Sequence, residues 1–300
     1  MTEQQYYQNL TPPKGPIDCI LDTDAYNEID DQFAIAYLVR SASENLRIKS
    51  FYAAPFHNRL SNSPADGMEK SYQELKRILS LCGANYPIYR GSKNYLPDEK
   101  TPVLSEAAKD LAKRALDYSA EHPLYIIAIG AITNIASALL LEPKMRENCV
   151  VVWLGGHAWH YHDTNEFNMK QDIAAARVVM GSGVPFIQLP CMGVVNLFGI
   201  SKPEAEQYLL GKNPLANYLG ERIIKEYLQK PYAFKVLWDV TAVAWLLNEE
   251  ARFMLYRTLP AHLPDYDHHY EETPSPYPIS LVYHIKRQEL MEDLLEKITK

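Results

Sequence analysis

Five acidic side chains lie within the ten-residue segment 22–31: Asp22, Asp24, Glu28, Asp30 and Asp31. Carboxylates this close repel one another unless a cation neutralises them. Their oxygen atoms are hard ligands, which favour Ca²⁺ or Mg²⁺ over softer metals. The segment therefore predicts a site for a divalent cation.

The acidic segment has two simpler interpretations. An acidic residue at a helix start often serves only as a cap or as a partner of the helix dipole. That would explain the last two carboxylates but not Asp22 and Asp24. An EF-hand loop requires Asp or Asn at its fifth position and Gly at its sixth, where this chain has Tyr26 and Asn27. The EF-hand is therefore excluded.

The acidic segment joins an apolar run at 17–21, typical of a buried strand, to a helical pattern at 33–39. Further strands are predicted at 48–54, 87–89, 124–129, 149–154 and 185–189, and helices at 67–82, 103–121, 134–141 and 173–181. Alternating strands and helices predict an α/β fold with an open, mostly parallel, Rossmann-like sheet and helices on both faces. In such sheets ligands bind at the carboxyl ends of the strands.

The last third of the chain changes pattern and predicts a C-terminal helical cover on the same domain. Helices are predicted at 203–210, 214–228 and 239–248, an irregular proline-rich stretch at 255–278, and a strand at 279–283. We therefore expect residues 1–300 to form a single α/β domain, with residues 1–15 flexible.

The composition of the chain limits the classes of partner that we expect it to bind. A hydrophobic content of 47% suits one large α/β domain, and the net charge of −7 argues against a nucleic-acid backbone as partner. No apolar stretch approaches the ~18 residues of a membrane span, so we expect no membrane partner. The four cysteines lack a C-x-x-C pair and are typical of buried residues in a reducing compartment: Cys19, Cys82, Cys149 and Cys191. A cytoplasmic protein is expected.

Other polar segments follow the predicted strands, where a site would lie. They are 53–58, which ends in Asn58; 129–134, which begins with Ile129; the histidine-rich loop 155–168, with His157, Glu166 and Asn168; and the late pair Trp238 and Asp239.

With these segments in this order, the chain resembles the inosine-uridine-preferring nucleoside hydrolase family over about residues 17–295. That family carries a D-x-D-P-G-x-D-D loop, a T-N-I-A segment, an E-F-N triplet and a late H-D pair. They stand here at 22–31, 133–136, 166–168 and 238–239. The resemblance implies hydrolysis of the N-glycosidic bond of ribonucleosides to ribose and free base, in purine or pyrimidine metabolism, by a homo-oligomer, either a dimer or a tetramer.

The resemblance also assigns metal ligands. It implies that Asp24, Asp31, Asp239 and the backbone carbonyl of Ile129 bind Ca²⁺, whose six to eight oxygen ligands such a set could supply. Asp24 would also be the catalytic base toward the attacking water that Ca²⁺ binds.

Substrate-binding residues follow from the same resemblance. Asp30 would accept a hydrogen bond from the ribose 2′-hydroxyl, Glu166 and Asn168 would hold the other hydroxyls, and Asn58 is the best match to a family asparagine. The bond cleavage develops positive charge on the sugar, which carboxylates and amide oxygens stabilise. Asp22 is expected to lie behind the ligands.

Two departures from the family pattern matter. The loop between Asp24 and Asp30 is two residues longer than usual, and Trp238 stands where many relatives have the histidine that protonates the leaving base. An indole cannot supply that proton. Candidate donors are His157, His160, His162 and Tyr232. Trp238, Trp159 and Tyr161 could instead stack on a nucleobase or pack among the helices.

Alternative functions remain open from the sequence. His157, His160, His162 and Asp163 could bind zinc, although their spacing matches no known motif. The D-x-D at 22–24 is similar to that of haloacid-dehalogenase-like phosphatases, which also need a later lysine and an acidic pair. A riboside-binding protein, or a slow, atypical hydrolase without the histidine acid, is a further alternative. Thr133 and Asn134 are expected to cap a helix.

Overall fold

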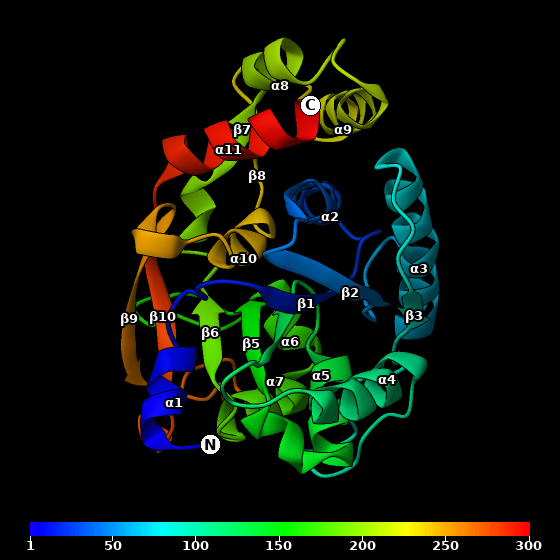
Figure 1. Cartoon of the computed structure of the whole chain (residues 1–300). Helices are drawn as coiled ribbons and strands as arrows, with labels where there is room; N and C mark the ends of the chain where they lie inside the picture. Colours follow the sequence, from blue (N-terminus) through cyan, green and yellow to red (C-terminus); the bar gives the residue numbers. More distant parts are fainter.

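The computed structural model describes all 300 residues and shows an eight-stranded sheet in the order β3-β2-β1-β4-β5-β6-β10-β9 (Figure 1). Only the pairing of β9 with β10 is antiparallel. The strands are β1 Ile17–Thr23, β2 Leu46–Ala53, β3 Ile88–Arg90, β4 Leu124–Ala128, β5 Cys149–Leu154, β6 Phe186–Leu189, β9 Met254–Pro260 and β10 Pro278–Ile285. The predicted α/β fold with a mostly parallel sheet is confirmed.

Helices cover both faces of this sheet. One face is covered by α2 Ile29–Ser41, α3 Pro64–Leu81 and α10 Val240–Trp245, with α9 Pro214–Glu226 and α11 Arg287–Thr299 packed on α2, and the other face by α4 Glu106–Arg114, α5 Thr133–Leu141 and α7 Ile173–Gly181. The shorter elements are α1 Glu3–Asn9, α6 Phe167–Gln171, α8 Lys202–Tyr208 and a two-stranded sheet of β7 Gly199–Ser201 and β8 Phe234–Val236. Helices α8, α9 and α11 gather at one end of the molecule, as the top of Figure 1 shows.

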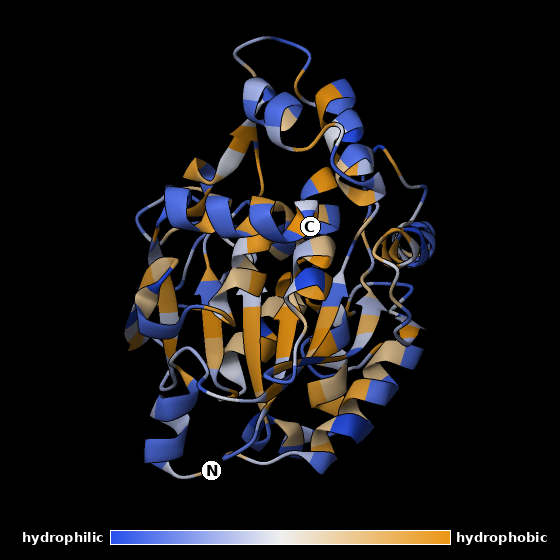
Figure 2. Ribbon diagram, turned by 45° about the horizontal axis from the view of Figure 1, so that its top comes forward, coloured by the Kyte–Doolittle hydropathy of each residue, from blue (hydrophilic) through white to orange (hydrophobic).

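The central strands are apolar throughout because both of their faces are buried. In β1, Cys19 and Leu21 join the core under α2, whereas Ile20 joins the core under α5. Successive strand residues point to opposite faces, so a strand covered on both sides needs a continuous apolar run. Figure 2 shows these strands as the most hydrophobic part of the fold, inside helices with hydrophilic outer surfaces.

The main error of the sequence prediction is strand β9. It occupies part of the stretch 255–278 that was expected to be irregular. As the antiparallel edge strand it is largely exposed on one side, so it lacks the apolar run that marks the inner strands. Helix α11 was not expected either.

The N-terminal segment, expected to be flexible, contains helix α1. Thr2 and Gln5 form a capping box at its start, and the Tyr6 hydroxyl donates a hydrogen bond of 2.9 Å to the Pro278 carbonyl at the beginning of β10. These contacts attach α1 to the edge of the sheet.

Several expectations about the environment of the protein can be compared with the fold. All four cysteines are buried and unpaired, as predicted. No helix is both long and apolar enough to cross a membrane. Cytoplasmic location and homo-oligomeric assembly stay predictions.

The central position of β4 gives a test of the fold. We expect Ile126→Ala, which removes a fully buried side chain, to lower the free energy of unfolding by about 2–5 kcal/mol, because a cavity is left in the core. Leu104→Ala is the control, since that side chain is 62% exposed and its loss should change stability by less than about 0.5 kcal/mol. Urea denaturation measures both, and equal effects would contradict the assignment of β4 to the core.

Candidate functional site

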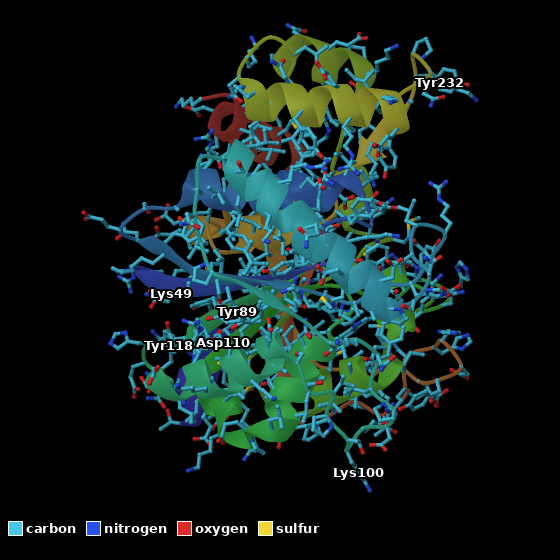
Figure 3. All side chains as sticks on the ribbon, turned by 90° about the vertical axis from the view of Figure 1, so that its right-hand side faces the viewer. Lys49, Tyr89, Lys100, Asp110, Tyr118 and Tyr232 are labelled. Atoms are coloured by element: carbon cyan, nitrogen blue, oxygen red, sulfur yellow. The ribbon has the colours of Figure 1, made fainter.

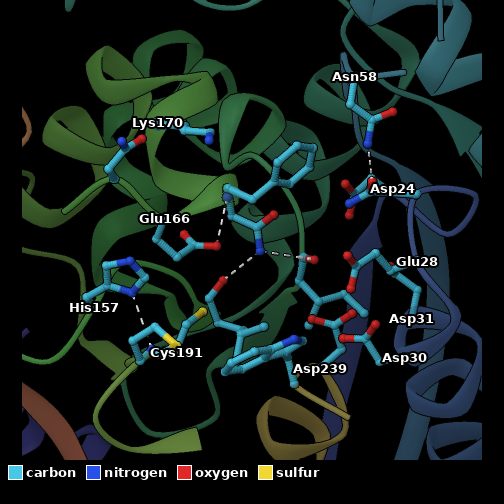
Figure 4. A pocket seen from close by; sticks show the side chains of 18 residues that line it. Asp24, Glu28, Asp30, Asp31, Asn58, His157, Glu166, Lys170, Cys191 and Asp239 are labelled. Carbon is cyan, nitrogen blue, oxygen red and sulfur yellow. Dashed lines mark hydrogen bonds between the residues drawn. The ribbon is translucent and has the colours of Figure 1, made fainter. Parts of the chain in front are cut away.

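A cavity of about 330 Å³ opens at the carboxyl ends of the strands, a size within the usual range for small-molecule sites. Asp24 follows β1, Asn58 follows β2, and Ile129 follows β4. Every residue predicted for the site lines this cavity (Figure 4): Asp24, Asp30, Asp31, Asn58, Ile129, His157, Glu166, Asn168, Trp238 and Asp239.

Asp24, Asp30, Asp31 and Asp239 form the acidic cluster of this cavity, and all four are buried. Burial, followed by the charges of neighbouring carboxylates, raises the pKa of Asp24, Asp31 and Asp239 well above the usual range for aspartate. Both carboxylate oxygens of Asp24 are buried without a hydrogen-bond partner. Buried acceptors of this kind are costly unless they are neutralised, so the cluster has the character of a cation site.

Asp22 lies behind this cluster and does not line the cavity, as predicted. The Asn134 side-chain amide donates to Asp22 Oδ1 at 2.7 Å, and burial raises the pKa of Asp22 to about 7 although this hydrogen bond opposes the shift. The predicted capping role of Thr133 and Asn134 is wrong. Neither side chain caps α5. The Asn134 amide donates to Asp22 instead, and the Thr133 hydroxyl donates to Asp172 at 2.6 Å.

Lys235 is a part of the site that the sequence analysis missed. Its Nζ atom lies 2.5 Å from Glu28 Oε2 and 3.1 Å from Asp30 Oδ1, and the residue is only 8% exposed. Burial disfavours its charge, but Asp30 and Glu28 outweigh this and raise the pKa of Lys235. The lysine belongs to β8, far from the acidic segment in sequence, so no local pattern could have revealed it. It neutralises one side of the acidic cluster.

The opposite wall of the cavity is formed by Glu166 and Asn168. The backbone N–H groups of Gly156, Asn168 and Met169 each donate to the Glu166 carboxylate at 2.9 Å, which fixes its position at the start of α6. The Asn168 amide donates to the Leu154 carbonyl at 3.0 Å and to the Ile129 carbonyl at 3.4 Å. These bonds attach the E-F-N segment to the ends of β4 and β5.

Asn58 is held close to the acidic segment. Its amide donates to Asn27 Oδ1 at 2.6 Å, and its own Oδ1 accepts from the Leu60 N–H at 2.8 Å. The loop after β2 therefore closes one side of the cavity against the loop after β1.

The histidine-rich loop contributes only one of the candidate proton donors to the cavity. His157 is buried and lines it, whereas His160, His162 and Tyr232 do not. Tyr232 is 80% exposed and projects from the molecule (Figure 3). In Figure 4, His157 lies across the cavity from Asp24, beyond Glu166.

The aromatic residues divide between the cavity and the core. Trp238 lines the cavity. Trp159 instead packs against His262 and Tyr270, and its indole N–H donates to Gln188 Oε1 at 3.2 Å. Of these two, only Trp238 is placed to contact a ligand.

Nowhere in the chain do three histidine, cysteine or acidic side chains converge as a ready-made metal-binding group. In the histidine-rich loop, His162 Nε2 lies 2.9 Å from the Asp163 carboxylate, whereas His157 Nε2 lies 3.9 Å from it. The acidic cluster is an open set of oxygen atoms around the cavity.

Comparison with known proteins identifies the family to which the chain belongs. The sequence model of the inosine-uridine preferring nucleoside hydrolase family matches residues 19–273. The chain belongs to this family. The resemblance predicted from four short motifs is thereby confirmed, and three of these motifs, at 22–31, 166–168 and 238–239, contribute residues to the cavity.

Curated relatives within this nucleoside hydrolase family include the pyrimidine-specific ribonucleoside hydrolase RihA of Citrobacter koseri. It is 25% identical over 247 residues, which cover 72% of this chain and 76% of the relative. The protein of the same name from Salmonella enteritidis is 26% identical with the same coverage.

Solved structures of nucleoside hydrolases share the fold. A plant nucleoside hydrolase superposes with a TM-score of 0.73 at 16% identity, covering 95% of this chain and 99% of its own. The purine-preferring ribonucleoside hydrolase of Gardnerella vaginalis gives a TM-score of 0.70 at 18% identity, with coverages of 94% and 98%.

The raised carboxylate pKa values predict how stability changes with pH. Because folding raises these pKa values, the folded protein binds protons more tightly than the unfolded chain, so stability should fall as pH rises through them. In a chelating buffer we expect the free energy of unfolding to fall between pH 5 and pH 8, by up to about 1.4 kcal/mol per pH unit for each such carboxyl group. Added Ca²⁺ should restore most of the lost free energy of unfolding at pH 8, because it binds the folded protein.

Urea denaturation in chelator and in CaCl₂ measures this effect. Asp239→Asn is the matched variant, because it removes one charge from the acidic cluster and should reduce the pH dependence in chelator. Equal stability at pH 5 and pH 8 without cation would contradict the raised pKa values of these carboxylates.

Proposed function

We propose that this protein is a Ca²⁺-dependent ribonucleoside hydrolase that cleaves the N-glycosidic bond to release ribose and the free base. The observation that carries the proposal is a single cavity with two walls: the acidic cluster on one side, and Glu166 with Asn168 on the other. Membership of the nucleoside hydrolase family supports it.

The residues present fit a hard divalent cation. Asp24, Asp31, Asp239 and the Ile129 carbonyl would hold it, since all of them line the cavity and offer oxygen ligands. The unpartnered oxygens of Asp24 and the open arrangement suit Ca²⁺, whose coordination is flexible, better than Mg²⁺, which demands a near-ideal octahedron. When bound, the cation supplies positive charge that acidifies water and orients adjacent hydroxyl groups.

Asp24 is the proposed general base. Its carboxylate would accept the proton of a water molecule that the bound cation makes more acidic. Its two oxygen atoms make no hydrogen bond within the protein, so they are free to accept from water.

The remaining polar residues would bind the ribose. Asp30, which Lys235 holds in place at 3.1 Å, would accept from the 2′-hydroxyl, and Glu166 and Asn168 would hold the other hydroxyls. Asn58 would close the site beside the acidic segment. Negative charge around the sugar stabilises the positive charge of the transition state, and the need for a 2′-hydroxyl favours ribosides over deoxyribosides.

Protonation of the departing base is the weak point of this site. Trp238 has no proton to give and would instead stack on the base. His157 lies across the cavity from Asp24 (Figure 4), away from the carbon that the water attacks. Turnover should therefore depend on how readily the base leaves, and a slow hydrolase or riboside-binding protein is the second candidate.

Substitution of the proposed base tests the first role. Asp24→Asn should lower kcat by about 10²–10⁴-fold, because a general base contributes a factor of this size. It should also weaken Ca²⁺ binding. Base release followed by absorbance and calcium titration by calorimetry measure the two effects. Activity within a few-fold of the unmodified protein would remove Asp24 from both roles.

The leaving group tests the role of Trp238. We expect 4-nitrophenyl riboside, which needs no acid, to be cleaved far faster than inosine or uridine. Trp238→His should raise kcat for the natural nucleosides relative to the nitrophenyl riboside, by up to about 10²-fold if the new imidazole protonates the base. Release of phosphate from phosphomonoesters, without release of base from any riboside, would overturn the hydrolase proposal.

A further inference from the structure

The cavity continues beyond Glu166 to an end that the proposed reaction does not use. His157 and Lys170 line this end, and both are labelled in Figure 4 on the side away from Asp24. Lys170 follows Glu166 by one helical turn in α6. Lys170 is exposed at the mouth of this end, and no carboxylate lies within ion-pair distance of its ammonium group, whereas Lys235 is buried and paired with Glu28 and Asp30. We refer to His157 and Lys170 as the donor end of the cavity.

His157 presents a hydrogen-bond donor at this end. Its Nδ1 atom accepts from the Met192 N–H at 3.3 Å, so the neutral ring carries its proton on Nε2. The Nε2 atom lies 3.9 Å from the Asp163 carboxylate, which is beyond hydrogen-bond distance. Burial lowers the pKa of His157, and the charges of His162 and Lys170 act in the same direction while Asp163 opposes them. The ring is therefore a neutral donor near Lys170.

The two ends of the cavity therefore differ in the polar groups that they present. Around Asp24 it offers carboxylates, which accept hydrogen bonds from hydroxyl groups and attract cations. Around Lys170 it offers the His157 N–H and the positive charge of the lysine, with the Asp163 carboxylate 3.9 Å from the His157 Nε2 atom. The Glu166 carboxylate lies between the two ends. It accepts hydrogen bonds from three backbone N–H groups, which partly neutralise its negative charge. A ligand that fills the whole cavity must carry hydroxyl groups at one end and strong acceptors at the other.

The orientation of the sugar, which rests on the proposed function, places the 5′-carbon toward the donor end. Attack at C1′ requires this carbon to face Asp24, and the 2′-hydroxyl is assigned to Asp30. C4′ and its 5′-substituent leave the ring from the other side, past Glu166. A group attached to the 5′-oxygen therefore extends toward His157 and Lys170.

We propose that the donor end is a subsite for a phosphate on the 5′-oxygen, so that the protein binds and hydrolyses 5′-phosphorylated ribosides. A phosphate oxygen forms charge-assisted hydrogen bonds with a lysine ammonium, and such bonds are stronger than neutral ones. The His157 N–H supplies a second contact, which would orient the phosphate.

Binding of the sugar fragment tests the subsite without turnover. In CaCl₂ we expect ribose 5-phosphate to bind at least tenfold more tightly than ribose, measured by isothermal titration calorimetry. Lys170→Gln should remove most of this advantage, and His157→Phe part of it. Lys109→Gln is the matched control, because Lys109 is exposed on α4 and does not line the cavity. Equal binding of the two sugars, or an advantage that survives in Lys170→Gln, would overturn the subsite.

A second measurement separates this proposal from the hydrolase proposal. The ratio of kcat/KM for inosine 5′-monophosphate to that for inosine, followed by release of hypoxanthine, should fall about tenfold in Lys170→Gln and stay constant in Lys109→Gln. If neither compound releases base while ribose 5-phosphate keeps its Lys170-dependent advantage, the hydrolase proposal fails and the subsite stands only as a binding site. If inosine is cleaved and its phosphate is neither bound nor cleaved, the subsite fails and the hydrolase proposal stands.

Discussion

Repulsion among buried carboxylates is the constraint on which the site depends. Asp24, Asp31 and Asp239 are all buried; besides burial, the charge of Asp31 raises the pKa of Asp24, and the charges of Asp31 and Asp24 raise that of Asp239. Nearby polar groups reduce the cost of these charges, since the Thr23 hydroxyl donates to Asp31 and Lys235 pairs with Asp30. The two carboxylate oxygens of Asp24 have no hydrogen-bond partner. Their negative charge is therefore not neutralised within the protein, which favours binding of a cation.

The parallel sheet supplies the rigidity that this arrangement needs. Because β1, β4 and β5 are adjacent, their carboxyl ends bring the acidic segment, the Ile129 carbonyl and the loop to Glu166 to one place. Helices on both faces bury the strands completely, so these ends cannot shift without disturbing the core. The bonds from Asn168 to the ends of β4 and β5 then fix the far wall of the cavity to the same framework.

Local patterns allowed much of this to be predicted. Asp24 and Asp31 stand out because they follow an apolar run and precede a helical one, and Glu166 and Asn168 because they sit in a short family motif. Lys235 escaped prediction because its partners are distant in sequence. Asn134 was misjudged for a related reason, since a residue at a helix start is normally a cap and only tertiary structure places Asp22 beside it. The sequence prediction missed edge strand β9 because an exposed strand lacks the continuous apolar run that marks a buried one.

The origin of Asp239 and Lys235 in the C-terminal helical part has a consequence for biosynthesis. The acidic segment at 22–31 is made well before its neutralising lysine, Lys235, and its last carboxylate, Asp239. Contacts of such long sequence separation form late in folding, because closing a long loop is entropically costly. A nascent chain without Lys235 and Asp239 therefore carries an incomplete cluster, and cation affinity would mark the moment at which these two distant segments have come together.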